Sequence, residues 1–303
     1  MTLLTPGLKA ALELMRPANI VTALADILAG FFAAGGILLF VGGSIQTAPA
    51  GLIWLLASTA GLYGGGVVFN DVFDATLDAD ERPERAIPSG RISQSSAVIL
   101  GVLLLGSGIL FAFNVSVTSG YLAAAIATAA LIYNAKAKHS AFWGPLFMGF
   151  CRGLNLLLGI SILPAELAEL WLLVFIPVTY IGAITLISQG EVKGGTRFSG
   201  YLSLAFIVLI TVSLVLLSLD PSYQLYPSLP FTGLFGLMVI PAFLHAALSR
   251  RPHVIKKAVK RGVLSLIILN SALAAGFAGF SMGILVLTLL PLSFLLSRAF
   301  SVT

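Results

Sequence analysis

The chain of 303 residues is 58% hydrophobic and only 10% charged, and its mean hydropathy is +1.03. Soluble domains average about 45–50% apolar and about 25% charged residues, so this composition excludes an ordinary soluble protein and predicts an integral multi-pass membrane protein. The formal net charge of +5 comes from basic residues in short loops between apolar runs, which indicates membrane orientation and argues against a nucleic-acid partner.

Apolar runs long enough to cross a bilayer, which takes about 17–25 residues, follow one another along the chain. They predict an all-α bundle of nine or ten transmembrane helices in a single membrane-embedded domain, residues 1–303. The last two runs are separated only by Ser281, Met282 and Gly283, so they form either one bent helix or a tight hairpin. The predicted spans are residues 17–41, 50–70, 95–114, 119–134, 141–162, 170–188, 200–219, 231–249, 262–281 and 283–298.

The loops between these runs alternate in charge. Lysine and arginine close to helix ends are retained on the cytoplasmic side, so the N-terminus and the basic loops are predicted to be cytoplasmic, with the protein in the cell (plasma) membrane. The alternate loops carry no basic residue, and the two that carry any charge hold only acidic side chains. The basic loops are residues 9–16, 82–91, 136–138, 193–197 and 250–261.

The strongest functional signal is the segment 70–91, where the apolar chain becomes polar. On a helix, Asp71, Asp74 and Asp78 are spaced i, i+3 and i+7, so their carboxylates share one face, with Asn70 one turn before Asp74. Carboxylates grouped in this way repel each other unless a cation lies between them, and their hard oxygens suit Mg²⁺, which takes one or two carboxylates plus phosphate oxygens. The pattern therefore predicts Mg²⁺ held by the three aspartates, and a diphosphate substrate.

The other polar segments, 133–138 and 188–197, lie on the same predicted side of the membrane as 70–91. A cavity opening there would hold Mg²⁺ and diphosphate at its entrance and an isoprenoid tail among the apolar helices. A tail that partitions into lipid needs a site that lipid can reach, whereas a soluble sugar nucleotide would need a larger polar pocket than these loops supply.

Two charged residues are predicted to lie inside the membrane. Asp26 and Arg152 are each roughly ten or more residues into a span, which places both roughly 15–20 Å deep at 1.5 Å per residue. Charges at that depth are rare and usually paired, so we expect the two to be partners. With Asn19 and Asn155 they form a polar patch that either positions an oxygen of an acceptor or locks two helices together.

These residues resemble the UbiA superfamily of intramembrane aromatic prenyltransferases. The first aspartate-rich motif of that family, N-D-x-x-D-x-x-x-D, is matched in full from Asn70 to Asp78, and the R-x-I-P-S-G-R-I-S-like segment that follows it is matched at 85–93. Residues 16–19 and 133–138 are weaker matches. The resemblance implies a helical bundle around a central cavity open to the cytoplasmic side, a Mg²⁺-bound prenyl diphosphate, and transfer of the prenyl carbon to an acceptor.

The chemistry of such a transfer assigns roles to individual residues. The metal would neutralise the diphosphate leaving group, and basic side chains would add further charge as the allylic carbon becomes positive. The ring of Tyr133 either stabilises that carbocation or serves only in packing. The predicted diphosphate-binding residues are Asn70, Arg85, Arg91, Lys136, Lys138 and Lys193.

A second aspartate-rich motif is expected in this family near residues 188–197, and here the chain departs from the pattern. Only Glu191 is acidic in that segment. The segment is then either a phosphate-binding loop with Glu191 as a lone ligand or base, or a connector whose glycines allow a tight turn. This altered loop resembles the EboC-like branch of UbiA-like proteins, which implies a role in making or exporting a secondary metabolite or lipid precursor.

The predicted function is therefore Mg²⁺-dependent transfer of a prenyl group from a prenyl diphosphate to an aromatic or other lipophilic acceptor within the membrane. The alternative is a UbiA-like protein that binds or exports an isoprenoid with little or no catalysis, because the second motif is degenerate. An ion-coupled transporter is disfavoured, since no internal repeat is visible. The acceptor, the prenyl length and the oligomeric state leave no recognisable pattern.

Overall fold

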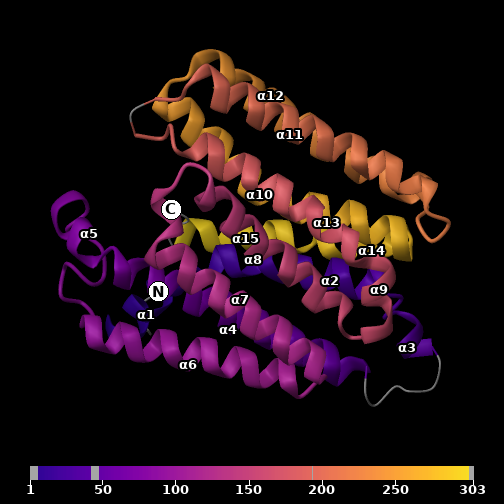
Figure 1. Cartoon of the computed structure of the whole chain (residues 1–303), viewed down its shortest axis with the longest axis horizontal. Helices are drawn as coiled ribbons and strands as arrows, with labels where there is room; N and C mark the ends of the chain where they lie inside the picture. The colour runs from indigo at the N-terminus through magenta and orange to yellow at the C-terminus, as the bar shows by residue number, and fades with distance from the viewer. Residues whose placement is uncertain (1–5, 42–47, 193, 300–303) are drawn as a thin grey trace.

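The computed structural model describes residues 6–41, 48–192 and 194–299, and this part of the chain is a bundle of helices without a strand (Figure 1). Short 3-10 turns, η1 (Ala137–His139), η2 (Pro164–Glu166), η3 (Trp171–Val174) and η4 (Leu217–Leu219), join some of the helices. The α-helices are α1 (Pro6–Met15), α2 (Pro17–Ala33), α3 (Leu38–Val41), α4 (Ala48–Phe73), α5 (Ala75–Glu81), α6 (Gln94–Phe113), α7 (Val117–Ala135), α8 (Trp143–Ile160), α9 (Leu167–Leu170), α10 (Phe175–Ser188), α11 (Arg197–Leu216), α12 (Leu225–Ser249), α13 (Pro252–Ala278), α14 (Phe280–Leu287) and α15 (Leu289–Ala299).

Each of the ten predicted spans coincides with a helix or a pair of helices, and the all-α prediction is confirmed. By length and composition, the described residues contain eight helices able to cross a membrane, or nine if α1 and α2, bent by 45°, count as one span. The higher count agrees with the predicted nine or ten helices. Helix α8, which has 18 residues and carries Arg152 and Asn155 in its interior, is outside this count.

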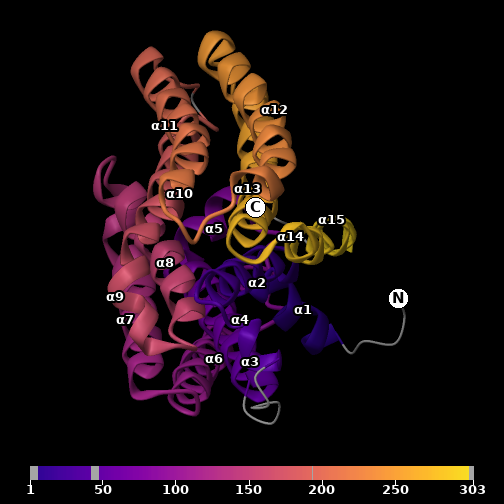
Figure 2. The ribbon, with the colours of Figure 1, turned by 90° about the vertical axis from the view of Figure 1, so that its right-hand side faces the viewer.

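Six helices form a ring in the centre of the molecule (Figure 2). Helix α2 packs against α4, α8 and α13, α7 packs against α4 and α8, and α10 joins α8 to α13. The remaining long helices lie outside this ring: α6 covers α4 and α7, the α11–α12 pair packs on α10 and α13, and α15 lies along α2. Large apolar side chains are exposed on these outer helices, which is the pattern of a surface that faces lipid. Examples are Ile99, Leu103, Leu110, Leu209 and Leu216.

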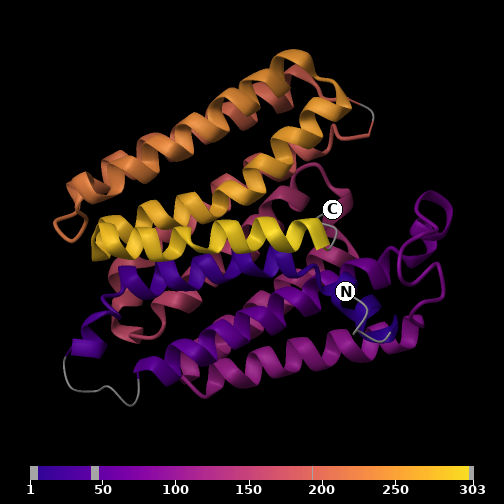
Figure 3. The ribbon, with the colours of Figure 1, turned by 180° about the vertical axis from the view of Figure 1, so that it is seen from behind.

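Local sequence signals set several helix ends. Ser93 and Thr196 precede α6 and α11, and their side-chain oxygens accept hydrogen bonds from the backbone N–H groups of Ser96 and Ser199. The last two spans are a hairpin, not one bent helix, as Figure 3 shows at the α13–α14 junction. The reversal occurs at Gly279, whose φ of 91° lies in a region that other residues rarely adopt, and not at the predicted residues 281–283.

The crossing of α2 and α8 brings two backbones unusually close. A Cβ atom on Gly30 would lie 2.2 Å from the carbonyl oxygen of Leu156, and one on Gly159 would lie 2.5 Å from that of Ile27. Small residues at a helix crossing allow this approach in membrane proteins. The crossing places the Arg152 side chain of α8 directly against α2.

Candidate active site

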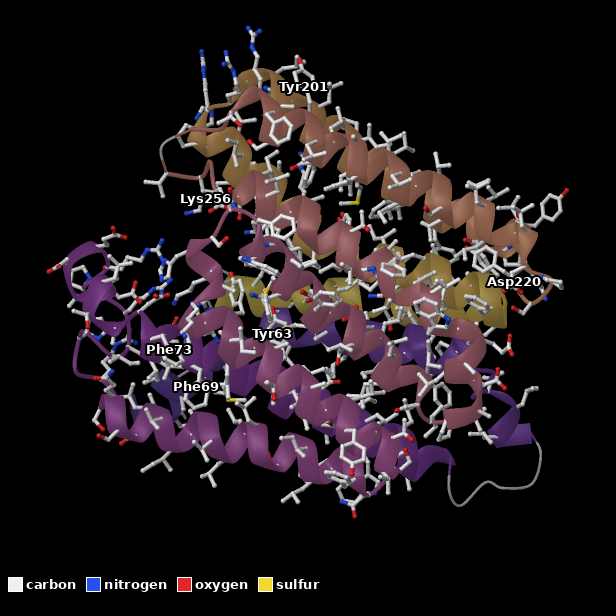
Figure 4. The ribbon with its side chains drawn as sticks, in the orientation of Figure 1. Tyr63, Phe69, Phe73, Tyr201, Asp220 and Lys256 are labelled. Carbon is white, nitrogen blue, oxygen red and sulfur yellow. The ribbon has the colours of Figure 1, made fainter. Side chains whose placement is uncertain are left out.

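A cavity of about 910 Å³ lies inside the central ring. One end is polar and is lined by charged side chains from α1, from the C-terminal end of α4, from the 82–91 loop and from the start of α13. In Figure 4, Lys256 and Phe73 mark the end of the molecule where this rim lies, and Asp220 lies at the opposite end. The body of the cavity is apolar, with a lining that includes Leu62, Ile126, Ile181, Val263 and Leu266.

At the rim, two of the three predicted aspartates share one arginine. Nη1 of Arg85 lies 3.2 Å from Oδ1 of Asp71 and 2.7 Å from Oδ2 of Asp78, and Nη2 of Arg16 also binds Oδ1 of Asp71 at 2.7 Å. The i, i+7 spacing therefore does place Asp71 and Asp78 on one face. In the structure, two arginines of the chain, Arg16 and Arg85, bind these carboxylates.

The backbone of Arg16 explains how its side chain reaches the rim. Its φ and ψ of 49° and 68° lie in the left-handed region, between the end of α1 and Pro17 at the start of α2. This conformation costs a residue other than glycine about 1–3 kcal/mol, and such strain is typical of functional sites. The turn directs the guanidinium from the α1–α2 junction to Asp71, 55 residues later.

Asp74 has a different partner. Helix α4 ends at Phe73, and Asp74 is the residue between α4 and α5, although the backbone hydrogen bonds from Asp74 to Asn70 and from Asp78 to Asp74 continue across it. Its Oδ1 lies 2.5 Å from Nζ of Lys138 in η1. We call these six residues, which balance three negative against three positive charges, the rim cluster: Arg16, Asp71, Asp74, Asp78, Arg85 and Lys138.

Asn70 links α4 to α7. Its side-chain amide donates to Oδ1 of Asn134 at 3.1 Å, and the amide of Asn134 in turn donates to the carbonyl oxygen of Gly66 at 2.8 Å. Arg91 closes the 82–91 loop by pairing with Glu13 of α1 and donating to the carbonyl oxygen of Glu84 at 2.8 Å. Both predicted residues thus line the cavity from firmly held positions.

The rim offers donors that suit Mg²⁺. Among the described residues, no three His, Cys, Asp or Glu side chains are grouped to hold a metal by themselves. Asp71 and Asp74 both line the cavity, and their ion pairs use only Oδ1, so no hydrogen bond or ion pair from the described part of the chain engages either Oδ2. Two available carboxylate oxygens fit a metal that completes its shell with substrate oxygens and water.

Deeper in the bundle lies a second group of charges. Arg152 and Asp26 are paired as expected, with Nε of Arg152 2.9 Å from Oδ2 of Asp26. Amide groups of Asn155 and Asn270 donate to the two oxygens of Asp26 at 3.1 and 2.7 Å. Arg152 also donates to the backbone carbonyl oxygen of Thr22 at 2.8 Å. These five residues, which we call the floor cluster, tie together α2, α8 and α13.

The position of the floor cluster follows from its contacts to α4. Thr59 donates to Oδ1 of Asn155 at 2.7 Å, and the guanidinium of Arg152 lies 5.8 Å from the ring centre of Tyr63. Thr59 precedes Asp71 by 12 residues, which is about 18 Å along a helix. Tyr63 and the predicted Tyr133 both line the cavity between these two levels.

The second polar loop also reaches the cavity. Glu191 lies just after α10, is half-buried and lines the cavity, as does Lys256 at the start of α13. Burial raises the pKa of the Glu191 carboxyl, and the positive charges of Lys256 and Arg82 oppose that rise. The degenerate motif therefore still brings one carboxylate to the cavity wall, which leaves both readings of this loop possible.

The structure does not bring every predicted residue to the cavity lining. Asp78 is buried behind Arg85, Asp26 lies behind Arg152, and Lys138 touches the site through Asp74. Lys136 is exposed and is not among the lining residues. Lys193 lies outside the described residues. The predicted residues that do line the cavity are Asn19, Asn70, Asp71, Asp74, Arg85, Arg91, Tyr133, Arg152, Asn155 and Glu191.

Several site residues were not predicted from the sequence. Arg16 was noted only as part of a helix-start motif, and the arginine before a proline gave no sign of its long-range partner. Asn134 lies in the 133–138 segment without an assigned role. Tyr63 and Asn270 fall inside apolar runs, where a lone polar residue is the only available signal.

The helical spans, the cavity and its ion-paired rim define an integral multi-pass membrane protein with a polar site at one end of an apolar chamber. Comparison with known protein families identifies the family to which this membrane protein belongs. The chain belongs to the UbiA prenyltransferase family, whose family model matches residues 28–260. The family resemblance is thereby confirmed, while the EboC-like placement stays a prediction.

Two further comparisons agree with this family. A digeranylgeranylglyceryl phosphate synthase of Methanothrix thermoacetophila is 35% identical over 148 residues, which are 49% of this chain and 52% of that protein. The chain spans about half the length of the curated relatives it matches. A structure solved for digeranylgeranylglyceryl phosphate synthase in membranes matches with a TM-score of 0.67 at 19% identity, covering 90% of this chain and 99% of that one.

A UbiA homologue of Archaeoglobus fulgidus, solved bound to DMAPP and Mg²⁺, is similar with a TM-score of 0.61 and 17% identity. The match covers 89% of this chain and 99% of the homologue. At this level of identity the likeness establishes the fold, and the residue roles depend on the geometry described above.

Proposed function

We propose that this protein transfers a prenyl group from a prenyl diphosphate, held with Mg²⁺, to a lipophilic acceptor inside the membrane. One observation carries the proposal: Asp71 and Asp74 each line the charged rim of a cavity of about 910 Å³ and have a carboxylate oxygen, Oδ2, that no described residue engages, while apolar side chains such as Leu62, Ile126 and Leu266 line the same cavity. A diphosphate head and a hydrocarbon tail need those two environments side by side.

The rim cluster can accept such a head by exchanging partners. Arg16, Arg85 and Lys138 pair with the carboxylates of Asp71 and Asp74. These two carboxylates would hold Mg²⁺ when a diphosphate binds, and the three cations would then be available to phosphate oxygens. Asp78 is then a positioning residue, since its ion pair holds Arg85 in place from behind the cavity wall.

The chemistry to be assisted is departure of diphosphate from an allylic carbon. Mg²⁺, when bound, supplies neutralisation of the leaving group. Arg85, Arg91 and Lys138 add positive charge at the same end, where negative charge grows as the bond breaks. The ring of Tyr133, which lines the cavity, would stabilise the positive carbon through its face.

The acceptor is lipophilic, and it is either aromatic or a prenylated glyceryl phosphate. The family resemblance implies an aromatic compound, whereas the names of the relatives point to a glyceryl phosphate lipid. The apolar lining between Leu62 and Leu266 accommodates both kinds of hydrocarbon. Glu191, which lines the cavity from the second polar loop, serves as a base or as a lone metal ligand.

The proposal includes an arrangement in the cell. The whole chain, 1–303, is one membrane-embedded domain in the plasma membrane, with its N-terminus and the rim on the cytoplasmic side. Support comes from the loops: the basic segments lie at the end of the molecule marked by Lys256, and Asp220 belongs to the opposite end (Figure 4).

A second candidate function is binding or export of an isoprenoid without transfer. It is favoured by the second loop, which keeps Glu191 as its only carboxylate. The two functions share the same cavity and differ in turnover, so a turnover measurement separates them.

The test is release of diphosphate by the purified chain in vesicles of host lipid, with Mg²⁺ and either geranyl or geranylgeranyl diphosphate. We expect Asp71→Asn and Asp74→Asn each to lower the rate about 10²- to 10³-fold, the usual effect of removing one group that stabilises the transition state. Asp220→Asn, an exposed aspartate at the far end, is the matched control and should retain full activity. Substrate binding without release of diphosphate would establish the second candidate.

A further inference from the structure

A second, smaller cavity lies between α12 and α13, apart from the prenyl cavity. Its volume is about 290 Å³, and it shares no lining residue with the larger one. Ala242, Val254 and Ala258 give it small apolar walls. The polar lining residues are His245, His253, Lys257 and Arg261.

The charge of this pocket is of one sign. All four of its polar side chains are exposed, and its lining contains no carboxylate. Neither Lys257 nor Arg261 forms an ion pair with any residue that the structure describes, in contrast to the rim cluster, where every cation is paired. The pocket lies near the N-terminal end of α13 and near the C-terminal end of α12, so the two helix dipoles oppose each other there and its positive charge comes from the side chains.

The four polar residues come from two helix faces that meet at the pocket. His253, Lys257 and Arg261 are spaced i, i+4 and i+8 and share one face of α13. Lys256, one position earlier than Lys257, lines the prenyl cavity instead. The same end of α13 therefore serves two separate sites.

An exposed apolar track runs along α12 beside the pocket. Leu237, Leu244 and Leu248 are spaced i, i+7 and i+11 on the face next to the one that carries His245, and their exposed fractions are 77%, 41% and 60%. A ligand that lies along this track meets cations at one end and hydrocarbon-compatible surface along the rest. That combination matches a lipid with an anionic head.

We infer that the α12–α13 pocket binds the phosphate headgroup of an anionic phospholipid, with its acyl chains along the Leu237–Leu248 track. Basic pockets between transmembrane helices recognise such headgroups. The rule that basic residues are retained on the cytoplasmic side explains why Lys257 and Arg261 lie near a helix end. It does not explain why these two residues line one cavity together with His245 and His253.

The experiment measures lipid binding by the full chain in detergent, by native mass spectrometry, with phosphatidylglycerol and phosphatidylcholine of identical acyl chains. We expect phosphatidylglycerol to bind more tightly, and the double variant Lys257→Gln/Arg261→Gln to weaken its binding about 10- to 30-fold, as expected for two basic contacts. The charge-retaining variant Lys257→Arg/Arg261→Lys should keep most of the affinity, which separates a loss of charge from a loss of folding.

The matched control is Arg197→Gln/Arg251→Gln, which removes two exposed charges from the same end of the molecule but touches neither cavity. It should leave phosphatidylglycerol binding within about twofold of the unmodified chain. Equal weakening by both double variants would reduce the effect to general surface charge and overturn the inference. Inorganic phosphate that binds the pocket as tightly as the lipid would also overturn it, because the track along α12 would then contribute nothing.

Discussion

The prenyl cavity contains two groups of opposite charges, and they differ in how completely the charges are engaged. In the floor cluster, Oδ1 of Asp26 accepts from Arg152 and Asn270, and Oδ2 accepts from Asn155 and lies 2.9 Å from Nε of Arg152. In the rim cluster, the hydrogen bonds and ion pairs among the described residues engage only Oδ1 of Asp71 and of Asp74. The floor side chains of Asp26 and Arg152 are 1% and 4% exposed, whereas those of the rim pairs lining the cavity are 10–19% exposed.

This difference distinguishes the charges of the floor cluster, which hold helices together, from those of the rim cluster, which can bind a ligand. The buried carboxylate of Asp26 has both oxygens engaged by residues of α8 and α13, and it holds α2, α8 and α13 in one arrangement. The carboxylates of Asp71 and Asp74 are more exposed and keep Oδ2 without a partner among the described residues, so they can bind a ligand. Of the two roles expected for the polar patch, the geometry therefore favours helix locking, with Arg152 and Asn155 forming a polar part of the cavity wall.

The largest expected effect is on stability, at the floor. Asp26→Ala would leave Arg152 without its partner in a buried position, which costs about 3–5 kcal/mol. Unfolding of the purified protein, followed by circular dichroism against denaturant, measures this loss. Asp220→Asn, which changes an exposed residue, should alter stability by less than about 0.5 kcal/mol. If Asp26→Ala unfolds at the same midpoint as the unmodified chain, the floor cluster does not hold the helices together.

The next largest effect is stabilisation of the fold by ligands that bind at the rim cluster, and it requires both a prenyl diphosphate and Mg²⁺. Geranylgeranyl diphosphate with Mg²⁺, at about 100 times the dissociation constant, should stabilise the fold by about 2.7 kcal/mol, visible as a higher unfolding temperature. Removal of Mg²⁺ with a chelator should abolish most of this gain without destabilising the ligand-free protein, because Arg16, Arg85 and Lys138 already neutralise the carboxylates.

Asp71→Asn is the control for that measurement. It should unfold at a somewhat lower temperature than the unmodified chain when no ligand is present, because Arg16 and Arg85 lose a carboxylate partner, and it should show little gain when both ligands are added. A large destabilisation of the ligand-free protein by chelation alone would contradict the exchange of partners, since it would mean that the metal is already part of the resting rim.

The smallest effect is expected at the second loop. Burial raises the pKa of Glu191, so this carboxyl becomes protonated at a higher pH than an ordinary glutamic acid, whose pKa is about 4.3. If the carboxylate is the base or metal ligand, diphosphate release declines as the pH falls through that raised pKa. Glu191→Gln should then lower the rate at neutral pH and flatten the acidic side of the profile. Identical profiles for the two proteins would show that the loop is only a connector.

Some features of the site follow directly from sequence spacing. The i, i+7 relation of Asp71 and Asp78 predicts a shared face, and the two do share Arg85. The depths of Asp26 and Arg152 predict their pairing, because an unpaired charge in the membrane is costly. Both predictions rest on helix geometry and solvation, which depend on local sequence.

Other features depended on how distant segments meet. The sequence did not predict that Arg16 and Arg85 pair with Asp71, or that Lys138 pairs with Asp74. The third carboxylate of the expected metal set, Asp78, lies behind Arg85. No spacing rule could give these partners, since they are separated by up to 64 residues and depend on the packing of α2, α4 and η1.

The sequence by itself determined that the chain is helical and membrane-embedded, and that charged side chains are concentrated in residues 70–91, because the length of an apolar run and the position of charged residues reflect whether a segment lies in lipid or in water. Only the tertiary structure decided which carboxylate oxygens lack a partner among the described residues, which arginines pair with the aspartates, and that the ends of α12 and α13 enclose a second basic pocket. Those outcomes depend on where helices cross, and a crossing such as that of Gly30 with Gly159 is set by close packing between segments far apart in the chain.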